Sequence, residues 1–265
     1  MNSTTSVPVA DIVAALKVRY PAAVCALDWG GQHDSDPETR RRNGWRLLVM
    51  ARLSAQCTDA RVNQVCRELF RLYPTPGALA AAPQADVEAV IRPCGLFRTK
   101  AESIRATCAI LAADWAGLVP EDMDTLLSLP GVGRKIANLI RGDLYGQPGI
   151  VADTHCIRIC GRLGFYPEEL KDPVRAERIL SPLIPPEEQS DFCHRIVQFG
   201  RDTCTARAPA CGACPLRSFC AHGQKASLMG TRNRRTNRRF SKSVCVRFYT
   251  RRSTGSRGTA RSART

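Results

Sequence analysis

The sequence lacks the features of several common classes of protein. Its 265 residues contain no run of 18 consecutive apolar residues, which argues against a transmembrane helix. The N-terminus lacks the basic-then-apolar order of a secretory signal. No convincing alternation of apolar and polar residues predicts a strand. The hydrophobic content of 44% nevertheless argues against a wholly disordered chain, so we expect a folded protein without a membrane partner.

Acidic residues are absent from the last 41 residues, which contain 13 Lys and Arg. Nearly all of the formal net charge of +15 lies there, because residues 1–224 carry 26 basic against 24 acidic residues. A basic soluble protein suggests a polyanionic partner, most often nucleic acid. The alternative is a solvated tail with no specific partner. Because residues 226–265 are rich in Arg, Ser, Thr and Gly, we expect this tail to be disordered.

Apolar residues recur at helical spacing along most of the remaining chain. In residues 59–73, Val62, Val65, Cys66 and Leu69 share one helical face. Residues 30–44 are polar, and we expect them to join a first helix to the body of the fold. The class predicted is all-α with short connections. Further helices are predicted at 47–55, 85–94, 99–115, 136–144, 154–162, 173–183 and 187–199.

Thirteen cysteines, an odd number in a chain without a signal peptide, argue against a disulfide framework. Four of them, Cys204, Cys211, Cys214 and Cys220, follow the spacing C-x6-C-x2-C-x5-C. Four thiolates this close can hold a structural Zn²⁺ or a [4Fe–4S] cluster. Zinc sites usually show two C-x2-C pairs, and here there is one. The longer gaps suit a larger centre, although spacing alone leaves both groups open.

Two glycines separated by one residue precede the helix predicted at 136–144. Gly131 and Gly133 of the motif Leu129-Pro-Gly-Val-Gly-Arg-Lys135 form a tight turn that can point backbone N–H groups at a phosphate. The basic Arg134 and Lys135 follow. This pattern favours a helix-hairpin-helix that holds the DNA backbone without reading sequence. The alternative is an ordinary connection between two helices.

A carboxylate opens the next predicted helix, in the motif Val151-Ala-Asp153-Thr-His155. Taken alone, Asp153 is an N-cap residue. It lies 18 residues after Lys135, with one helix and a turn between them. That separation allows the two side chains to meet across a groove.

Several motifs together resemble the endonuclease III family of DNA glycosylases with AP-lyase activity. The resemblance runs from about residue 45 to residue 220, and the four-cysteine spacing is also that of the family. It implies a [4Fe–4S] cluster and a two-domain, all-α helix-hairpin-helix glycosylase fold. The expected parts are an N-terminal helix (1–34) packed with the cluster domain (148–225), and a six-helix bundle (35–147). The motifs are Leu53-Ser-Ala-Gln-Cys-Thr-Asp59, Gly95-Leu-Phe-Arg-Thr-Lys-Ala101, Leu129-Pro-Gly-Val-Gly-Arg-Lys135, Val151-Ala-Asp-Thr-His155 and Phe199-Gly-Arg-Asp-Thr-Cys204.

The resemblance also implies a role for each residue of the site. Lys135 is the expected nucleophile, attacking C1′ of a damaged nucleoside that has been flipped out of the duplex. Its amine must be partly neutral, so its pKa must fall through desolvation or through positive charge such as that of Arg134. Asp153 is expected to stabilise the cationic sugar. Gln56 and Leu96 match family positions that fill the gap left by the flipped base and wedge the stack.

The function implied is removal of oxidised pyrimidines from duplex DNA, with cleavage 3′ to the abasic site by β-elimination. A monofunctional glycosylase and a non-catalytic DNA-binding module are the alternatives. The related adenine glycosylases have a small residue at the position of Lys135 and a catalytic Glu within the helix that precedes Gln56. In this sequence, residues 47–56 contain no acidic residue, so both differences favour the bifunctional lyase. We expect a monomer in the cytoplasm, at the nucleoid.

Overall fold

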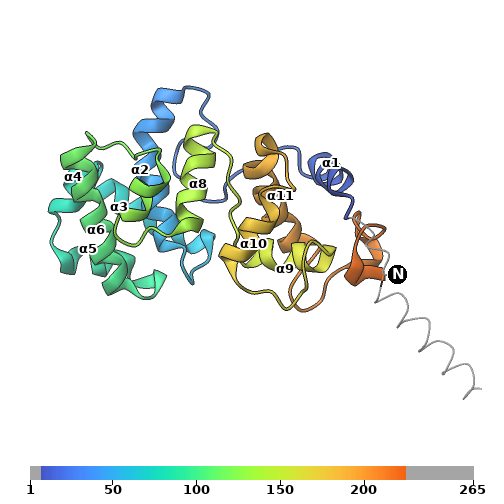
Figure 1. Ribbon diagram of the computed structural model, residues 1–265. Coiled ribbons are helices and arrows are strands. Elements are labelled where there is room, and N and C mark those ends of the chain that lie inside the picture. Colours follow the sequence, from blue (N-terminus) through green and yellow to red (C-terminus); the bar gives the residue numbers. More distant parts are fainter. Residues whose placement is uncertain (1–6, 225–265) are drawn as a thin grey trace, which may run out of the picture. The chain divides into compact units, whose positions relative to one another are not determined.

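The computed structural model describes residues 7–224, which belong to one compact unit (Figure 1). These residues form helices joined by short connections and contain no strand, so the predicted all-α class is confirmed. None of the helices between residues 7 and 224 is long and apolar enough to cross a membrane. The tail expected to be disordered, 226–265, lies outside the described residues.

The elements follow one another along the chain without any large interruption. They are α1 (Val9–Arg19), α2 (Pro37–Leu53), α3 (Asp59–Leu72), α4 (Pro76–Ala81), α5 (Gln84–Ile91), η1 (Arg92–Cys94), α6 (Phe97–Asp114), α7 (Met123–Ser128), α8 (Arg134–Tyr145), α9 (Thr154–Leu163), α10 (Pro173–Leu180), η2 (Pro186–Glu188), α11 (Gln189–Asp202) and η3 (Cys211–Ala213).

The first helix packs among the last ones. Figure 1 shows α2 to α8 together on one side of the described unit and α9 to α11 on the other, with α1 beside α11. The Tyr20 hydroxyl donates a hydrogen bond to Asp202 Oδ1 (2.7 Å), and Lys17 pairs with Glu188 (2.5 Å). The chain therefore crosses between the two groups of helices after α1 and again after α8.

Helix α2 begins at Pro37 and not at the predicted residue 47. The expectation that residues 30–44 form a connection is therefore wrong for residues 37–44, which are helical. The carboxylate of Asp36 accepts hydrogen bonds from the backbone N–H groups of Glu38 and Thr39, both 3.1 Å. Pro37 occupies the first turn, where its missing N–H costs nothing. An Asp-Pro start was therefore present in the sequence, but no apolar periodicity accompanied it.

The other predicted helices are present, with ends shifted by a few residues. Helix α10 ends at Leu180 and not at residue 183, and the stretch predicted as 85–94 is divided into α5 and the 3₁₀ turn η1. Pro93 lies within η1, and a proline removes an α-helical hydrogen bond. Helices α4 and α7 were not predicted, since six residues are too few to establish a period.

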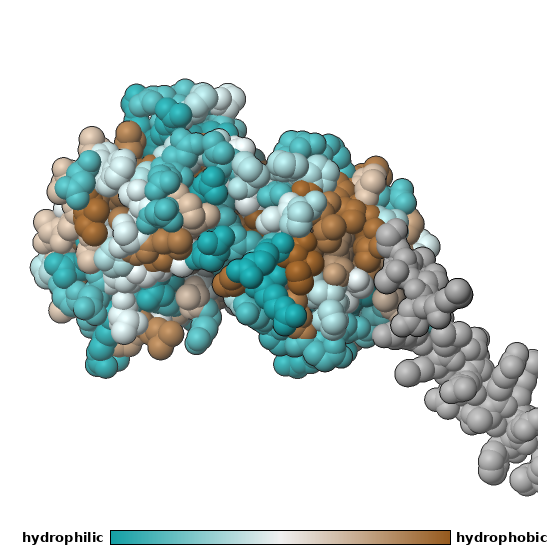
Figure 2. Space-filling model, viewed as in Figure 1, coloured by the Kyte–Doolittle hydropathy of each residue, from teal (hydrophilic) through white to brown (hydrophobic). Residues whose placement is uncertain are grey.

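Apolar side chains from all the long helices form the core. The second half of α2 is buried almost all round, as its mostly apolar sequence predicts. Trp45 meets the ring of Phe70 edge-on at 5.1 Å and joins α2 to α3. Hydrophilic residues cover most of the face seen in Figure 2, with smaller hydrophobic patches between them.

Candidate active site

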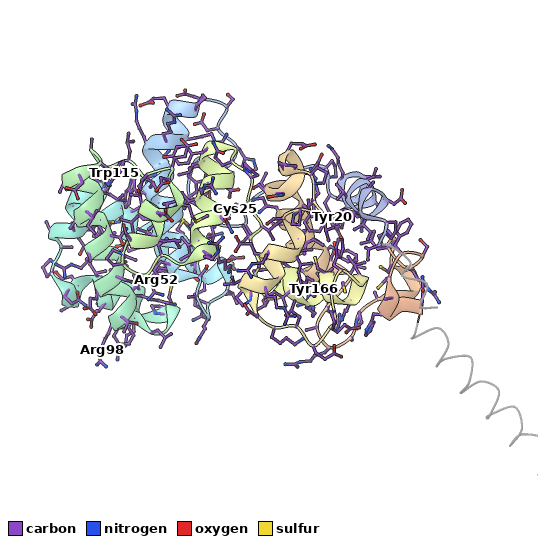
Figure 3. The ribbon with its side chains drawn as sticks, viewed as in Figure 1. Tyr20, Cys25, Arg52, Arg98, Trp115 and Tyr166 are labelled. Atoms are coloured by element: carbon purple, nitrogen blue, oxygen red, sulfur yellow. The ribbon has the colours of Figure 1, made fainter. Side chains whose placement is uncertain are left out.

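The predicted hairpin is formed by α7, the turn 129–133 and α8. Gly131 has φ +77°, and a Cβ there would lie 2.5 Å from Nε of Arg52 on α2. Arg52, labelled in Figure 3, also reaches Ser103 Oγ of α6 at 3.0 Å. Glycine at this position is therefore favoured by the left-handed backbone, and a Cβ would also displace the side chain of Arg52.

Gly133 is different, because nothing within the protein calls for glycine there. Its φ of −110° is open to any residue, and a Cβ would meet no atom within 4 Å. It is the N-cap of α8, and no side chain caps this helix start. The first N–H groups of a helix lack partners within the helix, and the helix dipole is positive at this end. The arrangement leaves room for an anion to approach the backbone closely.

Lys135 lies in the first turn of α8, and its side chain is exposed. It lines an open groove of about 1990 Å³ that Asp153 also lines. Cys25, labelled in Figure 3 between α8 and α11, is a further lining residue. The structure thus brings Lys135 and Asp153 to the same groove, as their separation in the sequence suggests.

Asp153 is the N-cap of α9. Its Oδ1 accepts a hydrogen bond from the Cys156 N–H at 2.7 Å, which fixes the carboxylate at the positive end of that helix. The residue is half-buried. Its N-cap role and its place in the groove are therefore compatible, since one oxygen satisfies the cap.

The guanidinium of Arg134 is already paired. It donates to both carboxylate oxygens of Glu177 on α10, at 2.9 and 2.5 Å. Burial raises the pKa of Glu177, but hydrogen bonds from Arg134 and Asn138 outweigh it, so the pKa lies below its usual value. Much of the positive charge expected beside Lys135 is thereby balanced. Because Lys135 is exposed, desolvation of its amine is not supplied by the free protein.

His155 and Arg201 also line the groove. Neither was assigned a role from the sequence, although both lie in motifs of the family. Burial lowers the pKa of His155, whose Nδ1 lies 3.3 Å from Nη2 of Arg158. A Cβ at Gly200 would come within 2.3 Å of that Nδ1, so α11 packs closely on the start of α9. Arg201 of α11 pairs with Asp59 of α3 and joins the two sides of the groove.

Gln56 and Leu96 both adopt left-handed backbone conformations that are uncommon for residues with a side chain. Their φ values are +56° and +47°. Leu96 is 59% exposed, and Gln56 is also exposed. Neither lines the groove, whereas Cys57, next to Gln56, does.

The four predicted ligands, Cys204, Cys211, Cys214 and Cys220, line one cavity of about 380 Å³. Within residues 7–224, no group of three or more His, Cys, Asp and Glu side chains is arranged to hold a metal ion. Four thiols around a shared cavity are the donor set of a [4Fe–4S] cluster. Burial raises the pKa of Cys214 and Cys220, so their protons must be displaced when iron binds.

Arg162 of α9 joins this loop to the helices and is 9% exposed. Its guanidinium donates to the carbonyls of Thr205 (2.8 Å) and Ala206 (2.9 Å) and lies 3.4 Å from Cys204 Sγ. Its own carbonyl lies 3.3 Å from Cys220 Sγ. The guanidinium places a buried positive charge beside the sulfur of Cys204, which suits a cluster bound through thiolates.

Two family models match the chain. Residues 49–186 match the HhH-GPD superfamily of base excision DNA repair proteins, and residues 204–220 match the iron-sulfur binding domain of endonuclease III. The second match covers all four cysteines, and the [4Fe–4S] cluster that the family resemblance implied is confirmed.

The similar proteins agree with these models. Endonuclease III of Synechocystis sp. is 40% identical over 215 residues, which cover 81% of this chain and 92% of the relative. The Bacillus subtilis endonuclease III is 42% identical, over 71% and 85% of the two chains.

Solved structures give the same result. A non-covalent endonuclease III–DNA complex has a TM-score of 0.72 at 39% identity and covers 83% of this chain and 96% of its own. A trapped covalent endonuclease III–DNA intermediate has a TM-score of 0.73 at 38% identity, with coverage of 84% and 100%. On this sequence identity and shared fold, the chain belongs to the endonuclease III family of the HhH-GPD superfamily.

Proposed function

We propose that this protein removes oxidised pyrimidines from duplex DNA, with Lys135 as nucleophile and Asp153 as the group that stabilises charge on the sugar. As a member of its family it is a bifunctional base-excision-repair glycosylase and AP lyase. The observation that carries the proposed roles is that Lys135, in the first turn of α8, and Asp153, at the start of α9, line one groove.

In the first step the neutral amine of Lys135 attacks C1′ of the flipped nucleoside. The C1′–N bond breaks, and the base leaves with the bonding electrons and takes a proton from solvent. Positive charge develops on the sugar as this bond breaks, and the carboxylate of Asp153 stabilises it. Because Lys135 is exposed in the free protein, water must be excluded from its amine by the bound DNA.

In the second step the sugar ring opens and C1′ becomes a protonated Schiff base with Lys135. This cation acidifies the C2′ proton. Loss of that proton expels the 3′ phosphate from C3′, which breaks the strand on the 3′ side. Water then hydrolyses the Schiff base and releases the amine.

The remaining residues hold the duplex. The open backbone at Gly133, with the left-handed turn at Gly131, binds a phosphate through N–H groups. Arg134, although paired with Glu177, has a side chain that is 44% exposed and can approach the same strand. Gln56 and Leu96 project from exposed turns and fill the space left by the flipped nucleotide. Cys204, Cys211, Cys214 and Cys220 hold the [4Fe–4S] cluster, which stabilises the loop they share.

We further propose that the enzyme works as a monomer on chromosomal DNA, in the cytoplasm at the nucleoid. The proposed catalytic residues lie in different domains: Lys135 belongs to the helical bundle of 35–147, and Asp153 belongs to the cluster domain of 148–225. Helix α1, from the first 34 residues, packs on the second of these. Gel filtration with and without a lesion-bearing duplex tests the oligomeric state.

The decisive experiment is reduction with borohydride during reaction on a duplex that contains thymine glycol, an oxidised pyrimidine. A covalent protein–DNA adduct is expected for the natural protein and none for Lys135→Ala. Lys171→Ala, which removes another exposed lysine, is the matched control and retains full trapping. Since Lys135 is exposed, the thermal midpoint is expected to change by less than about 2 °C.

The outcomes separate the alternatives. Base release without strand cleavage, until heat or alkali is applied, indicates a monofunctional glycosylase. Binding with neither base release nor cleavage of an abasic duplex indicates a non-catalytic module. Full trapping by Lys135→Ala contradicts the assignment of the nucleophile.

A further inference from the structure

A lysine outside the groove is completely buried. Lys100, in the first turn of α6, has no exposed surface. Its Nζ donates three hydrogen bonds to backbone carbonyls, those of Leu53 (2.9 Å), Ala55 (2.7 Å) and Cys94 (2.9 Å). An ammonium group has three donors, so all are used.

This charge is costly to bury. None of the ion pairs found within residues 7–224 includes Lys100. Burial lowers its pKa, the expected effect of removing a cation from water. An apolar residue of the same length would fill the space without that cost. The use of a lysine therefore points to its three hydrogen bonds, which an apolar residue cannot make.

The carbonyls of Ala55 and Cys94 lie in two loops that are distant in the sequence, and Leu53 ends α2 just before the first of them. One is the Gln56 loop, residues 54–58 between α2 and α3. The other is the Leu96 loop, residues 94–96, which runs from the last residue of η1 to the start of α6. Lys100 bonds to the carbonyl of the residue just before Gln56 and to that of the residue two before Leu96. It is thus a direct polar connection between the two loops.

Both loops need such support. Gln56 and Leu96 have φ values of +56° and +47°, which cost free energy and persist only where the surroundings impose them. The peptide group that joins Ala55 to Gln56 is fixed by its hydrogen bond to Lys100. Gly95, with φ +66°, lies between the bonded Cys94 and the left-handed Leu96. The Lys100 ammonium therefore holds the backbone that leads into each strained residue.

We infer that Lys100 is a positioning residue that sets Gln56 and Leu96 at a fixed separation before DNA binds. It touches neither the sugar nor the damaged base, and acts through the two exposed side chains. This inference rests on the proposed role of Gln56 and Leu96 in the space left by the flipped nucleotide. A preset pair loses less conformational entropy on binding than two independent turns would lose.

The test replaces Lys100 by Met, which has similar length and no donor. The substrate is a duplex with thymine glycol opposite 2-aminopurine, whose fluorescence rises when that base is unstacked. Single-turnover excision by Lys100→Met is expected to fall at least tenfold, and the fluorescence rise is expected to disappear. Gln189→Met is the matched control: Gln189 is also buried and donates to the carbonyls of Ser181 and Ile184. It should lose stability and keep the fluorescence rise.

A double-mutant comparison distinguishes positioning from stability. In a Gln56→Ala/Leu96→Ala background, Lys100→Met is expected to lower excision less than twofold further, because its targets are gone. Lys100→Gln keeps two donors and is expected to lie between Lys and Met. If Lys100→Met does not fold, Lys100→Gln is tested by the same criterion.

The results that overturn the inference are also distinct. An equal loss from Lys100→Met in both backgrounds means that Lys100 acts only through stability. Full activity of Lys100→Met overturns the inference and leaves the roles of Gln56 and Leu96 intact. Full activity and fluorescence of the Gln56→Ala/Leu96→Ala protein contradict the proposed function of that pair, whatever Lys100→Met does.

Discussion

The start of α8 and the four-cysteine loop are both specialised regions. The chemical groups face solvent in the first and an internal cavity in the second. At the start of α8, Lys135 is exposed and a Cβ at Gly133 would meet no neighbour. Around the cysteines, the guanidinium of Arg162 is buried and bonded, and the four thiols line a shared cavity. One region is arranged for a partner outside the protein, the other for a group held inside it.

This difference predicts how the two regions respond to substitution. A residue whose identity is set by an external partner can be replaced with little effect on folding, so only binding or catalysis changes. A residue set by internal contacts cannot be replaced without loss of stability, and function falls with it. Lys135→Ala, described above, is the extreme case of the first kind. The three predictions below test the comparison further.

Arg162→Met is expected to have the largest effect on stability. It leaves the carbonyls of Thr205 and Ala206 without their donor and removes the positive charge beside Cys204. The cost should be about 3 kcal/mol in the free energy of unfolding. Iron per chain should fall in parallel, measured by metal analysis and by loss of the yellow-brown colour. Arg207→Met, in the same loop but exposed, is the control and should retain its iron. A stable Arg162→Met protein with full iron content would contradict the idea that internal contacts set the identity of residues around the cysteines.

The two hairpin glycines provide a comparison within one turn. Gly131→Ala should cost about 2 kcal/mol or more, because its backbone is left-handed and its Cβ would meet Arg52. Gly133→Ala should cost less than about 1 kcal/mol, since its φ is ordinary and the space is open. Yet Gly133→Ala should weaken binding to undamaged duplex severalfold, since a methyl group separates phosphate from backbone. Urea unfolding and a fluorescence binding titration measure the two effects. Unchanged binding would mean that the hairpin does not contact phosphate.

The sequence predicted most of the fold, and it also supplied the proposed site residues, by two separate routes. Apolar spacing located the long helices, since a buried helical face repeats every 3.6 residues. It failed at residues 37–44, where α2 is held by its Asp36 cap and not by an apolar face. Motif resemblance supplied the proposed roles of Lys135 and Asp153, which periodicity alone would have left as a surface lysine and an N-cap.

What the sequence could not reveal were contacts made across the chain. Lys100 occupies the apolar face of α6, four residues before the buried Ile104, and that mismatch was a usable signal. Nothing in the sequence, however, says that its partners are the carbonyls of Leu53 and Ala55. The pairing of Arg134 with Glu177 is likewise invisible, because the partners are 43 residues apart. Such pairs depend on how helices pack, which spacing does not determine.

The third prediction concerns the link between the two regions, and its effect is the smallest. Nε2 of His194 on α11 lies 2.7 Å from Asp143 Oδ1 on α8, the helix whose first turn contains Lys135. Burial lowers the pKa of His194, but the hydrogen bond and charge of Asp143 outweigh it, so the pKa is raised above 6.5. The imidazolium is thus favoured in the folded state, and its contribution to the free energy of unfolding is fully present below pH 6.5. It is lost as the pH rises through the raised pKa of His194. Urea unfolding between pH 6 and 9 should therefore show a decline for the natural protein that His194→Gln lacks. Parallel plots of unfolding free energy against pH for the two proteins would mean that the His194–Asp143 pair does not couple α8 to α11, the helix that leads into the cysteine loop.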